Sequence, residues 1–304
     1  MPRIFLTTNY LTIYSLCLIG CLFFSQACSH KPIPEVKTQS PQILSESSVV
    51  KFRPLEDPVT LKNSGEPGRV ELVNNCSLAI TRTFDKEEIR HKKIEAVDFK
   101  VQTTTTKVLK NSNIIQNIQT IWKDGFVNLH DLAYPELGEI MEVESTRSGE
   151  IKKAGNYPKT SIFFLPPLPL PKKPVNVGEE WKSEHSWKSE ENGLPLKVSI
   201  VSKYLGSKQC GDFACAEISV KGEVHMPAAI EKKNGFMHKL SGRFLFEPKR
   251  GLLVWAEFGS DEAISAGGAR AEVRSTLRSE LILPLGYRTT DRGEPTCPIE
   301  TKEE

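Results

Sequence analysis

The sequence predicts an all-β protein, an antiparallel curved sheet in the form of a half-barrel or a sandwich. Three observations predict this class. Apolar and polar residues alternate with period two, with many threonine and β-branched residues, over 77–84, 97–105 and 196–200. Glycine turns separate pairs of such segments. Helical spacing of apolar residues is hard to find anywhere after the N-terminal segment.

Size and charge set the first limits on function. The chain has 304 residues, enough for one large β domain or two smaller ones. Its 40 basic and 38 acidic residues give a net charge of +2, without the excess of positive charge that nucleic-acid binding requires. A hydrophobic content of 38% is typical of a globular protein rather than one with many membrane spans. We therefore expect no nucleic-acid partner.

The N-terminus has the layout of an export signal over residues 1–27. An early cation, Arg3, precedes an apolar stretch at 11–24, and the small residues Ser25 and Ala27 follow it. The alternative is a retained membrane helix, which needs about 20 apolar residues. Polar residues at 7–9 interrupt the run too early for that, so export is the favoured interpretation.

Two cysteines are candidates for lipidation, because a bacterial lipoprotein signal ends in a cysteine that becomes the first residue. Cys21 follows Leu18-Ile19-Gly20, which is the better local motif. Cys28 follows Ser25-Gln26-Ala27, a weaker motif, but the sequence after it is polar at once, whereas Cys21 precedes more apolar residues. Cys28 is therefore the predicted anchor and Cys21 the alternative. The predicted location is the bacterial cell envelope, on the outer membrane and facing the periplasm or the surface.

The rest of the chain divides by composition. Residues 28–69 are rich in Pro, Ser, Lys and Glu and predict a flexible tether. Two predicted β halves follow at 70–163 and 179–288, joined by a proline-rich crossover at 164–178, and a tail completes the chain at 289–304. The halves could be similar, because each contains a strand, a glycine turn and a strand, at 140–151 and at 243–255.

The clearest strand prediction is residues 272–281, which read E-V-R-S-T-L-R-S-E-L. Odd positions are apolar or small, and even positions are charged or threonine. Because strand side chains alternate between the two faces of a sheet, one face should pack against the core and the other should be exposed to solvent.

The crossover contains the run P-P-L-P-L-P-K-K-P at 166–174. Prolines fix the φ angle and remove amide donors, so this run predicts an extended polyproline-like strut or an unpaired edge. A P-x-x-P ligand for a partner's aromatic groove is the alternative. A rigid crossover between two sheets is the favoured reading.

The run Pro171-Lys172-Lys173-Pro174-Val175-Asn176-Val177-Gly178-Glu179-Glu180-Trp181 resembles the P-x-x-P-V-x-V-G-x-x-W signature of uncharacterised secreted and lipid-anchored β proteins of Gram-negative-type bacteria. Cys215-Ala216-Glu217-Ile218 and Lys249-Arg250-Gly251 fit the later segments of that family in order. The resemblance spans about 129–283 and implies an exported β fold without an assigned activity. A more remote similarity is to the half-barrels of periplasmic lipoprotein carriers.

The motif W-K-S-E occurs twice, at 181–184 and 187–190. The spacing of six is even, so a strand would place Trp181, Trp187 and His185 on one face. The two tryptophans could form an exposed platform for glycan or could cover a β core. The core interpretation is favoured because aromatic side chains are major core components. These three residues are the candidate binding residues.

Four cysteines remain after export, in an oxidising compartment. Cys210 and Cys215 flank a short turn and predict a cross-hairpin disulfide, and Cys76 with Cys297 then follows by elimination. Three connectivities are possible for four cysteines.

Catalytic and metal-binding patterns are hard to find in this sequence. The histidines show no metal-site spacing, and no nucleophile elbow, P-loop or dinucleotide motif is present. We therefore expect no catalytic residues, no metal and no cofactor. The predicted function is a non-enzymatic, membrane-anchored envelope module that binds lipid, lipoprotein or a cell-wall component, or is structural. The alternative is an envelope-polymer hydrolase whose site is assembled only in the fold.

Overall fold

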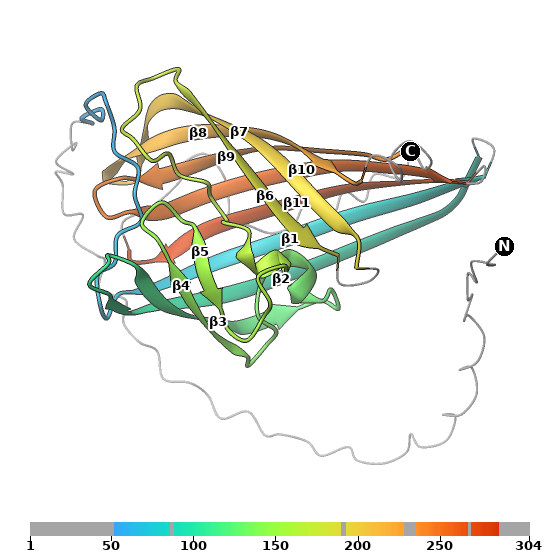
Figure 1. Ribbon diagram of the computed structural model, residues 1–304, viewed down its shortest axis with the longest axis horizontal. Coiled ribbons are helices and arrows are strands. Elements are labelled where there is room, and N and C mark those ends of the chain that lie inside the picture. Colours follow the sequence, from blue (N-terminus) through green and yellow to red (C-terminus); the bar gives the residue numbers. More distant parts are fainter. Residues whose placement is uncertain (1–51, 86–87, 190–192, 228–234, 267–268, 286–304) are drawn as a thin grey trace, which may run out of the picture. The chain divides into compact units, whose positions relative to one another are not determined.

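A computed structural model describes residues 52–85, 88–189, 193–227, 235–266 and 269–285. These residues form one antiparallel sheet of eleven strands, with two short 3₁₀ helices, and the sheet is strongly curved (Figure 1). The all-β prediction is confirmed. A sandwich and a division into two sheets are both wrong, because the two halves pair directly into a single sheet.

Two meanders build the sheet. The first contains β1 (Val70–Asp85), β2 (Glu88–Val108), β3 (Ile114–Asp124), β4 (Ile140–Ser145) and β5 (Ile151–Ala154). The second contains β6 (Glu180–Lys188), β7 (Pro195–Cys210), β8 (Phe213–His225), β9 (Met237–Glu247), β10 (Leu252–Ala266) and β11 (Ala269–Leu283). The 3₁₀ helices are η1 (Leu129–Leu132), between β3 and β4, and η2 (Ile162–Phe164), after β5.

Antiparallel pairing of the first strand with the last joins the two meanders. The strand order is β5-β4-β3-β2-β1-β11-β10-β9-β8-β7-β6, so β5 and β6 are the edges. These two edges are consecutive in the chain, and residues 155–179 run between them (Figure 1). Both predicted glycine hairpins are present, as β4–β5 and β9–β10.

The predicted alternation in 272–281 is borne out where the strand is covered. Leu281 and Ser279 are buried on one face of β11, whereas Arg274 on the other face is exposed. Towards Ala269 both faces of the strand are at least partly open to solvent. The concave face therefore carries the core at one end of the long strands, and none of the described residues buries β11 at the other end.

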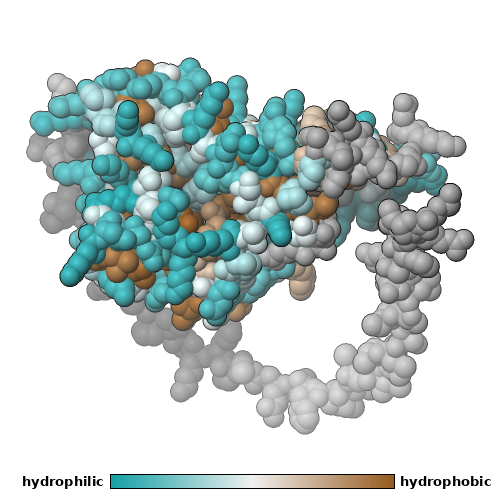
Figure 2. All heavy atoms as spheres, in the orientation of Figure 1, coloured by the Kyte–Doolittle hydropathy of each residue, from teal (hydrophilic) through white to brown (hydrophobic). Residues whose placement is uncertain are grey.

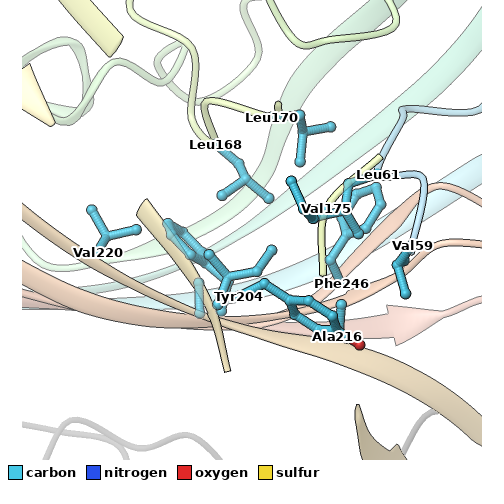
Figure 3. Close-up of a cluster of buried hydrophobic side chains, with 12 residues drawn as sticks. Val59, Leu61, Leu168, Leu170, Val175, Tyr204, Ala216, Val220 and Phe246 are labelled. Atoms are coloured by element: carbon cyan, nitrogen blue, oxygen red, sulfur yellow. The ribbon is translucent and has the colours of Figure 1, made fainter. Parts of the chain in front are cut away.

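The core of this face is covered by chain segments that are not strands. Figure 3 shows Leu168, Leu170 and Val175 of the crossover lying opposite Tyr204 and other side chains of the sheet. We name Leu165–Pro174 the proline strap. Residues 168–171 of the strap are buried, and Leu168 and Leu170 belong to the core, which the prediction of a rigid crossover did not include. A partner's groove could not reach these residues without unfolding the strap.

The segment before β1 also differs from its prediction. Val59 and Leu61 are 5% and 1% exposed in the same core cluster, and Val59 pairs with Val175 of the crossover through two backbone hydrogen bonds. The backbone N–H of Leu55 donates to Ser207 Oγ at 2.8 Å. The tether expected over 28–69 is thus packed against the sheet in this last part, because two apolar side chains among its polar residues are enough to fix it.

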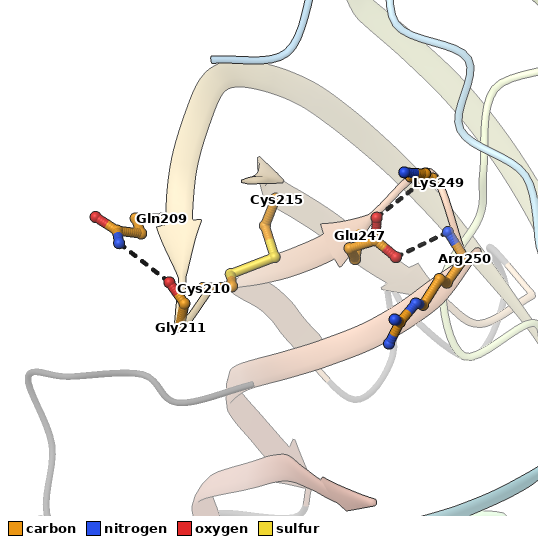
Figure 4. The surroundings of a disulfide bond; sticks show 7 residues. All are labelled: Gln209, Cys210, Gly211, Cys215, Glu247, Lys249 and Arg250. Carbon is orange, nitrogen blue, oxygen red and sulfur yellow. Dashed lines mark hydrogen bonds between the residues drawn. A yellow bond between two sulfur atoms is a disulfide. The ribbon is translucent and has the colours of Figure 1, made fainter. Parts of the chain in front are cut away.

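The Cys210–Cys215 disulfide is present, with a Cα–Cα distance of 5.9 Å, across the turn between β7 and β8 (Figure 4). Beside it, the buried carboxylate of Glu247 accepts hydrogen bonds from the backbone N–H groups of Lys249 and Arg250, and so fixes the β9–β10 turn. Cys76 is 3% exposed and is also disulfide-bonded. Its expected partner, Cys297, lies outside the described residues, so that pairing stays a prediction. Cys21 and Cys28 lie outside them too.

Candidate functional site: an apolar cavity beneath the proline strap

The candidate site is a cavity between the proline strap and the concave face of the sheet. Its volume is about 160 Å³. One wall is the strap, with Leu165, Pro166, Pro167 and Pro169. The opposite wall comes from five consecutive strands of the sheet, β6 to β10. Its residues are His185, Trp187, Val198, Ile200, Val220, Leu240, Phe244 and Phe258.

Strand register explains why these side chains converge. His185 on β6 pairs with Val198 on β7, which pairs with Val224 on β8. One step along, Ser183 pairs with Ile200, and Ile200 pairs with Gly222. Residues that pair across a sheet share a face, so each row points towards the strap. Gly222, which has no side chain, pairs with both Ile200 and Leu240, and these two residues line the cavity.

The strap suits an apolar cavity because of its prolines. A proline has no backbone N–H, so three of the four strap residues on the wall bring no amide donor that would need water. Across the cavity, Phe244 and Phe258 meet edge to face at 4.5 Å between ring centroids.

A hydrogen bond from a tryptophan ties the strap to the edge strand β6. The indole N–H of Trp181, on β6, donates to the carbonyl oxygen of Pro169 at 2.7 Å. Trp181 also packs against the core that contains Leu168 and Leu170. The strap therefore docks on an aromatic groove of its own chain, in the manner by which proline-rich ligands dock on aromatic grooves.

His185 is the polar group of the cavity wall. Its Nε2 atom is buried and has no hydrogen-bond partner among the described residues. Burial lowers the pKa of His185, although the charge of Glu150 acts in the opposite direction. The imidazole is therefore neutral at neutral pH.

The predicted binding residues are brought together in part. Along β6 the exposed fraction of the side chains alternates: the residues on one face are half-buried and the residues between them are exposed. The half-buried face carries Trp181, Ser183, His185 and Trp187, as the even spacing predicted. Trp187 and His185 line the cavity, whereas Trp181 belongs to the core and the strap contact. Whether these residues bind a ligand stays a prediction. The sequence did not indicate the other walls, since no local pattern brings the strap onto β7 to β10.

A second polar cluster lies in the loop between β3 and β4. His130 Nε2 is 2.8 Å from Glu139 Oε2, and the hydroxyl of Tyr157 donates to Glu139 Oε1 at 3.0 Å. Burial alone would raise the pKa of Glu139, but the hydrogen bonds from His130, the backbone N–H of Glu136 and Tyr157 lower it. Tyr157 stacks on Phe163 of η2 at 4.1 Å. The cluster links the loop to β5 and η2, which is a structural role.

Neither a metal-binding cluster nor a membrane-spanning helix is present in the ranges that the structure describes. Within those ranges no group of three or more His, Cys, Asp or Glu side chains could hold a metal ion. The same ranges contain no helix of the length and hydrophobicity required to cross a membrane. The face seen in Figure 2 is mostly hydrophilic, with hydrophobic side chains showing in a band across its middle.

Comparisons with known proteins place the chain in no family. No family model matches the sequence, and no curated protein sequence matches it. Among solved structures, one similar chain is from Bacteroides fragilis and is described as an exported protein with a YmcC-like fold, with 9% identity and a TM-score of 0.34 over 73% of this chain and 99% of that one.

Two further solved structures are similar at the same level. One, described as a lipoprotein of Parabacteroides distasonis, has 11% identity and a TM-score of 0.29 over 73% of this chain and 99% of that one. The other is the hypothetical lipoprotein YmcC of Escherichia coli, with 10% identity and a TM-score of 0.25 over 66% of this chain and 85% of that one. At these scores the likeness transfers no function, so the cavity has to be interpreted from its own residues.

Proposed function

We propose that this protein is an exported, lipid-anchored protein of the bacterial envelope that binds an apolar chain in the cavity beneath the proline strap, without catalysing a reaction. The anchor is Cys28, with Cys21 as the alternative. The observation that carries the binding role is the cavity itself, which has apolar walls contributed by five strands and by prolines that have no N–H.

The cavity volume sets the size of what can bind. An engineered protein cavity of about 150 Å³ accepts benzene, so about 160 Å³ suits a six-carbon group. Burying six methylene groups at about 0.8 kcal/mol each gives about 5 kcal/mol before the costs of association. After the costs of association are subtracted, the remaining free energy corresponds to millimolar or weaker affinity. The cavity alone therefore holds the end of a chain and not a whole long lipid.

The alternative function, hydrolysis of an envelope polymer, requires a histidine and a carboxylate that converge beside an accessible substrate site. His130 and Glu139 do converge, but their polar atoms bond to each other, to Tyr157 and to the loop backbone. The neutral His185 lies in an apolar wall instead. The geometry therefore favours binding over hydrolysis.

Photolabelling tests the binding role. The full chain, in membranes of the cell that makes it, would be irradiated with a photoreactive alkyl probe of about six carbons, and the labelled peptides would be identified by mass spectrometry. We expect labels on peptides that contain strap residues 165–169 or the facing residues of β7 and β8. Labels confined to the segment next to the anchor would contradict the proposal.

Intact mass of the same preparation tests the anchor. We expect a mature chain that begins at a diacylated or triacylated Cys28. A mass that still includes residues 22–24 would assign the anchor to Cys21, and a mass without lipid would contradict anchoring altogether.

A further inference from the structure

The wall of the cavity continues onto a part of the concave face where no strap residue lines it. Leu240 lines the cavity and pairs across the sheet with Ser260 of β10. Ser260 pairs in turn with Ser275 of β11, and Ser275 pairs with Ala79 of β1. Residues that pair across a sheet share a face, so this row leads from the cavity wall along the concave face to β1.

Two further rows extend the same surface away from the core. They contain one residue each from β10, β11 and β1: Glu262, Val273 and Thr81, and then Ile264, Ala271 and Thr83. Every residue of the three rows is partly exposed, and none belongs to a core cluster of the described residues. We name these three rows on β10, β11 and β1 the open floor.

The side chains of the open floor suit hydrocarbon. The hydroxyls of Ser260 and Ser275 bond to each other at 2.6 Å, so neither needs a polar partner from a ligand. The one charged side chain of the three rows is Glu262, whose Oε2 lies 3.7 Å from Nδ1 of His238 on β9, at the border of the floor. The opposite face of the same strands instead carries exposed ion pairs such as Arg274 with Asp261.

The dimensions match one lipid chain. Phe258 lines the cavity, and the six positions from it to Ile264 along β10 span about 20 Å, at about 3.4 Å per residue. The hydrocarbon core of a bilayer is about 30 Å thick and holds two chains end to end, so one chain takes about 15 Å. The cavity and the open floor together therefore have room for one whole chain, whereas the cavity alone accepts only its end.

We infer that the ligand is a single long hydrocarbon chain, whose methyl end lies in the cavity and whose remaining length lies on the open floor. This inference rests on the proposed function, because it extends the site proposed there. The methyl end is assigned to the cavity because the strap and the sheet enclose that space from two sides with apolar walls. The polar head group then lies at the far end of the floor, beyond Ile264 and Ala271.

The experiment uses two photoreactive fatty-chain probes of about 16 carbons, the length of a bilayer chain, on the full chain in membranes. One probe carries the photoreactive group next to the methyl end, and the other carries it at the middle of the chain. We expect the main label of the first probe on strap residues 165–169. We expect the main label of the second on peptides that contain 260–264 or 271–275. The same distribution of labels for both probes would overturn the inference.

Blocking the open floor tests the inference in a second way. Ser275→Phe would place a ring on the floor, whereas Arg274→Phe adds the same ring to the exposed opposite face of β11. With the methyl-end probe, we expect Ser275→Phe to lower strap labelling about tenfold, the effect of about four half-covered methylene groups losing their contact. Arg274→Phe should leave this labelling unchanged. The six-carbon probe, which needs only the cavity, should label the strap equally in both variants and in the unmodified protein.

The outcomes separate the two proposals. Mid-chain labels away from the open floor would show that the floor has another occupant and would overturn this inference, while leaving binding in the cavity intact. An equal loss for both chain lengths in Ser275→Phe, or no loss for the longer one, would do the same. If that variant does not fold, the comparison of the two long probes on the unmodified protein decides alone. Failure of every probe to label the strap of the unmodified protein would overturn the proposed function, and this inference with it.

Discussion

The indole N–H of Trp181 donates to the carbonyl oxygen of Pro169 at 2.7 Å, and this contact ties an edge strand of the sheet to the segment that roofs its cavity. The strap is part of the segment that connects the two edges of the open sheet. The hydrogen bond holds the strap over strands β6 to β10. Among the described residues, one side-chain hydrogen bond and the leucines of the core hold the strap, so we expect that it can be loosened without loss of the sheet.

Trp181→Phe removes the donor and keeps an aromatic ring in the core. We expect a loss of about 1 kcal/mol in the free energy of unfolding, the usual contribution of one hydrogen bond. Amide hydrogen exchange should rise in residues 165–170 that have an N–H. Trp122→Phe is the matched control, because Trp122 is half-exposed on β3, outside the cavity wall. Equal exchange in the two variants would contradict the role of the Trp181 contact.

Gly251→Ala tests the docking of the segment before β1. A Cβ at Gly251 would lie 2.2 Å from the backbone nitrogen of Ser64 and 2.5 Å from the carbonyl oxygen of Lys62, so the segment would have to move. Gly193→Ala carries the same penalty of positive φ, +67° against +65°, with nothing within 4 Å. We expect Gly251→Ala to lose about 1–3 kcal/mol more, from overpacking. Similar urea midpoints would show that the segment is not held there.

The Cys210–Cys215 bond closes a short loop, with a sequence separation of 5. The chain-entropy relation then gives about 2 kcal/mol of stabilisation. Replacing both cysteines with alanine should therefore lower the free energy of unfolding by about that amount, measured in urea, while the far-ultraviolet circular dichroism stays that of a β protein. An unchanged stability would mean that strand pairing alone fixes the β7–β8 hairpin.

Acid should loosen the loop that contains η1. The pKa values of Glu136 and Glu139 are both lowered, because hydrogen bonds from Lys123, His130, Tyr157 and the loop backbone outweigh the effect of burial. A lowered folded pKa gives stabilisation that is present above the unfolded value of about 4.5 and is lost as the pH falls below it. We expect hydrogen-exchange protection of residues 129–134 to fall in that range.

Glu139→Gln should reduce the same protection at neutral pH and weaken its acid dependence. Glu142→Gln is the control, since Glu142 is half-exposed on β4 and paired with Lys153. Loop protection that is independent of pH in the unmodified protein would contradict the assignment of these carboxylates.

Much of the sheet could be predicted from sequence, because alternation with period two is a local signal. It located strands in β1, β2, β7 and β11, and the even spacing of Trp181 and Trp187 placed them on one face of β6. Glycine turns located the β4–β5 and β9–β10 hairpins. The single sheet was not predicted, since the pairing of β1 with β11 joins residues about 200 positions apart.

The cavity could not be predicted for a related reason. Composition suggested a flexible tether over 28–69 and a rigid crossover at 164–178, yet Val59, Leu61 and Leu168 are core residues. The composition of a segment does not reveal a few isolated apolar residues within it. The place where these residues pack depends on the curvature of the sheet. The even spacing along β6 identified His185 as a candidate, but its place in the cavity wall depends on the strap opposite, which no local pattern brings there.

Filling the cavity tests the central claim most directly. Val220 lies in the wall, and Val220→Phe would place a larger ring inside it, whereas Lys221→Phe adds the same ring to the exposed face of β8. With the six-carbon photoreactive probe on the full chain, we expect Val220→Phe to lower labelling of strap residues 165–169 at least about tenfold, and Lys221→Phe to leave it unchanged. Equal labelling in all three proteins would show that the apolar chain does not bind beneath the strap.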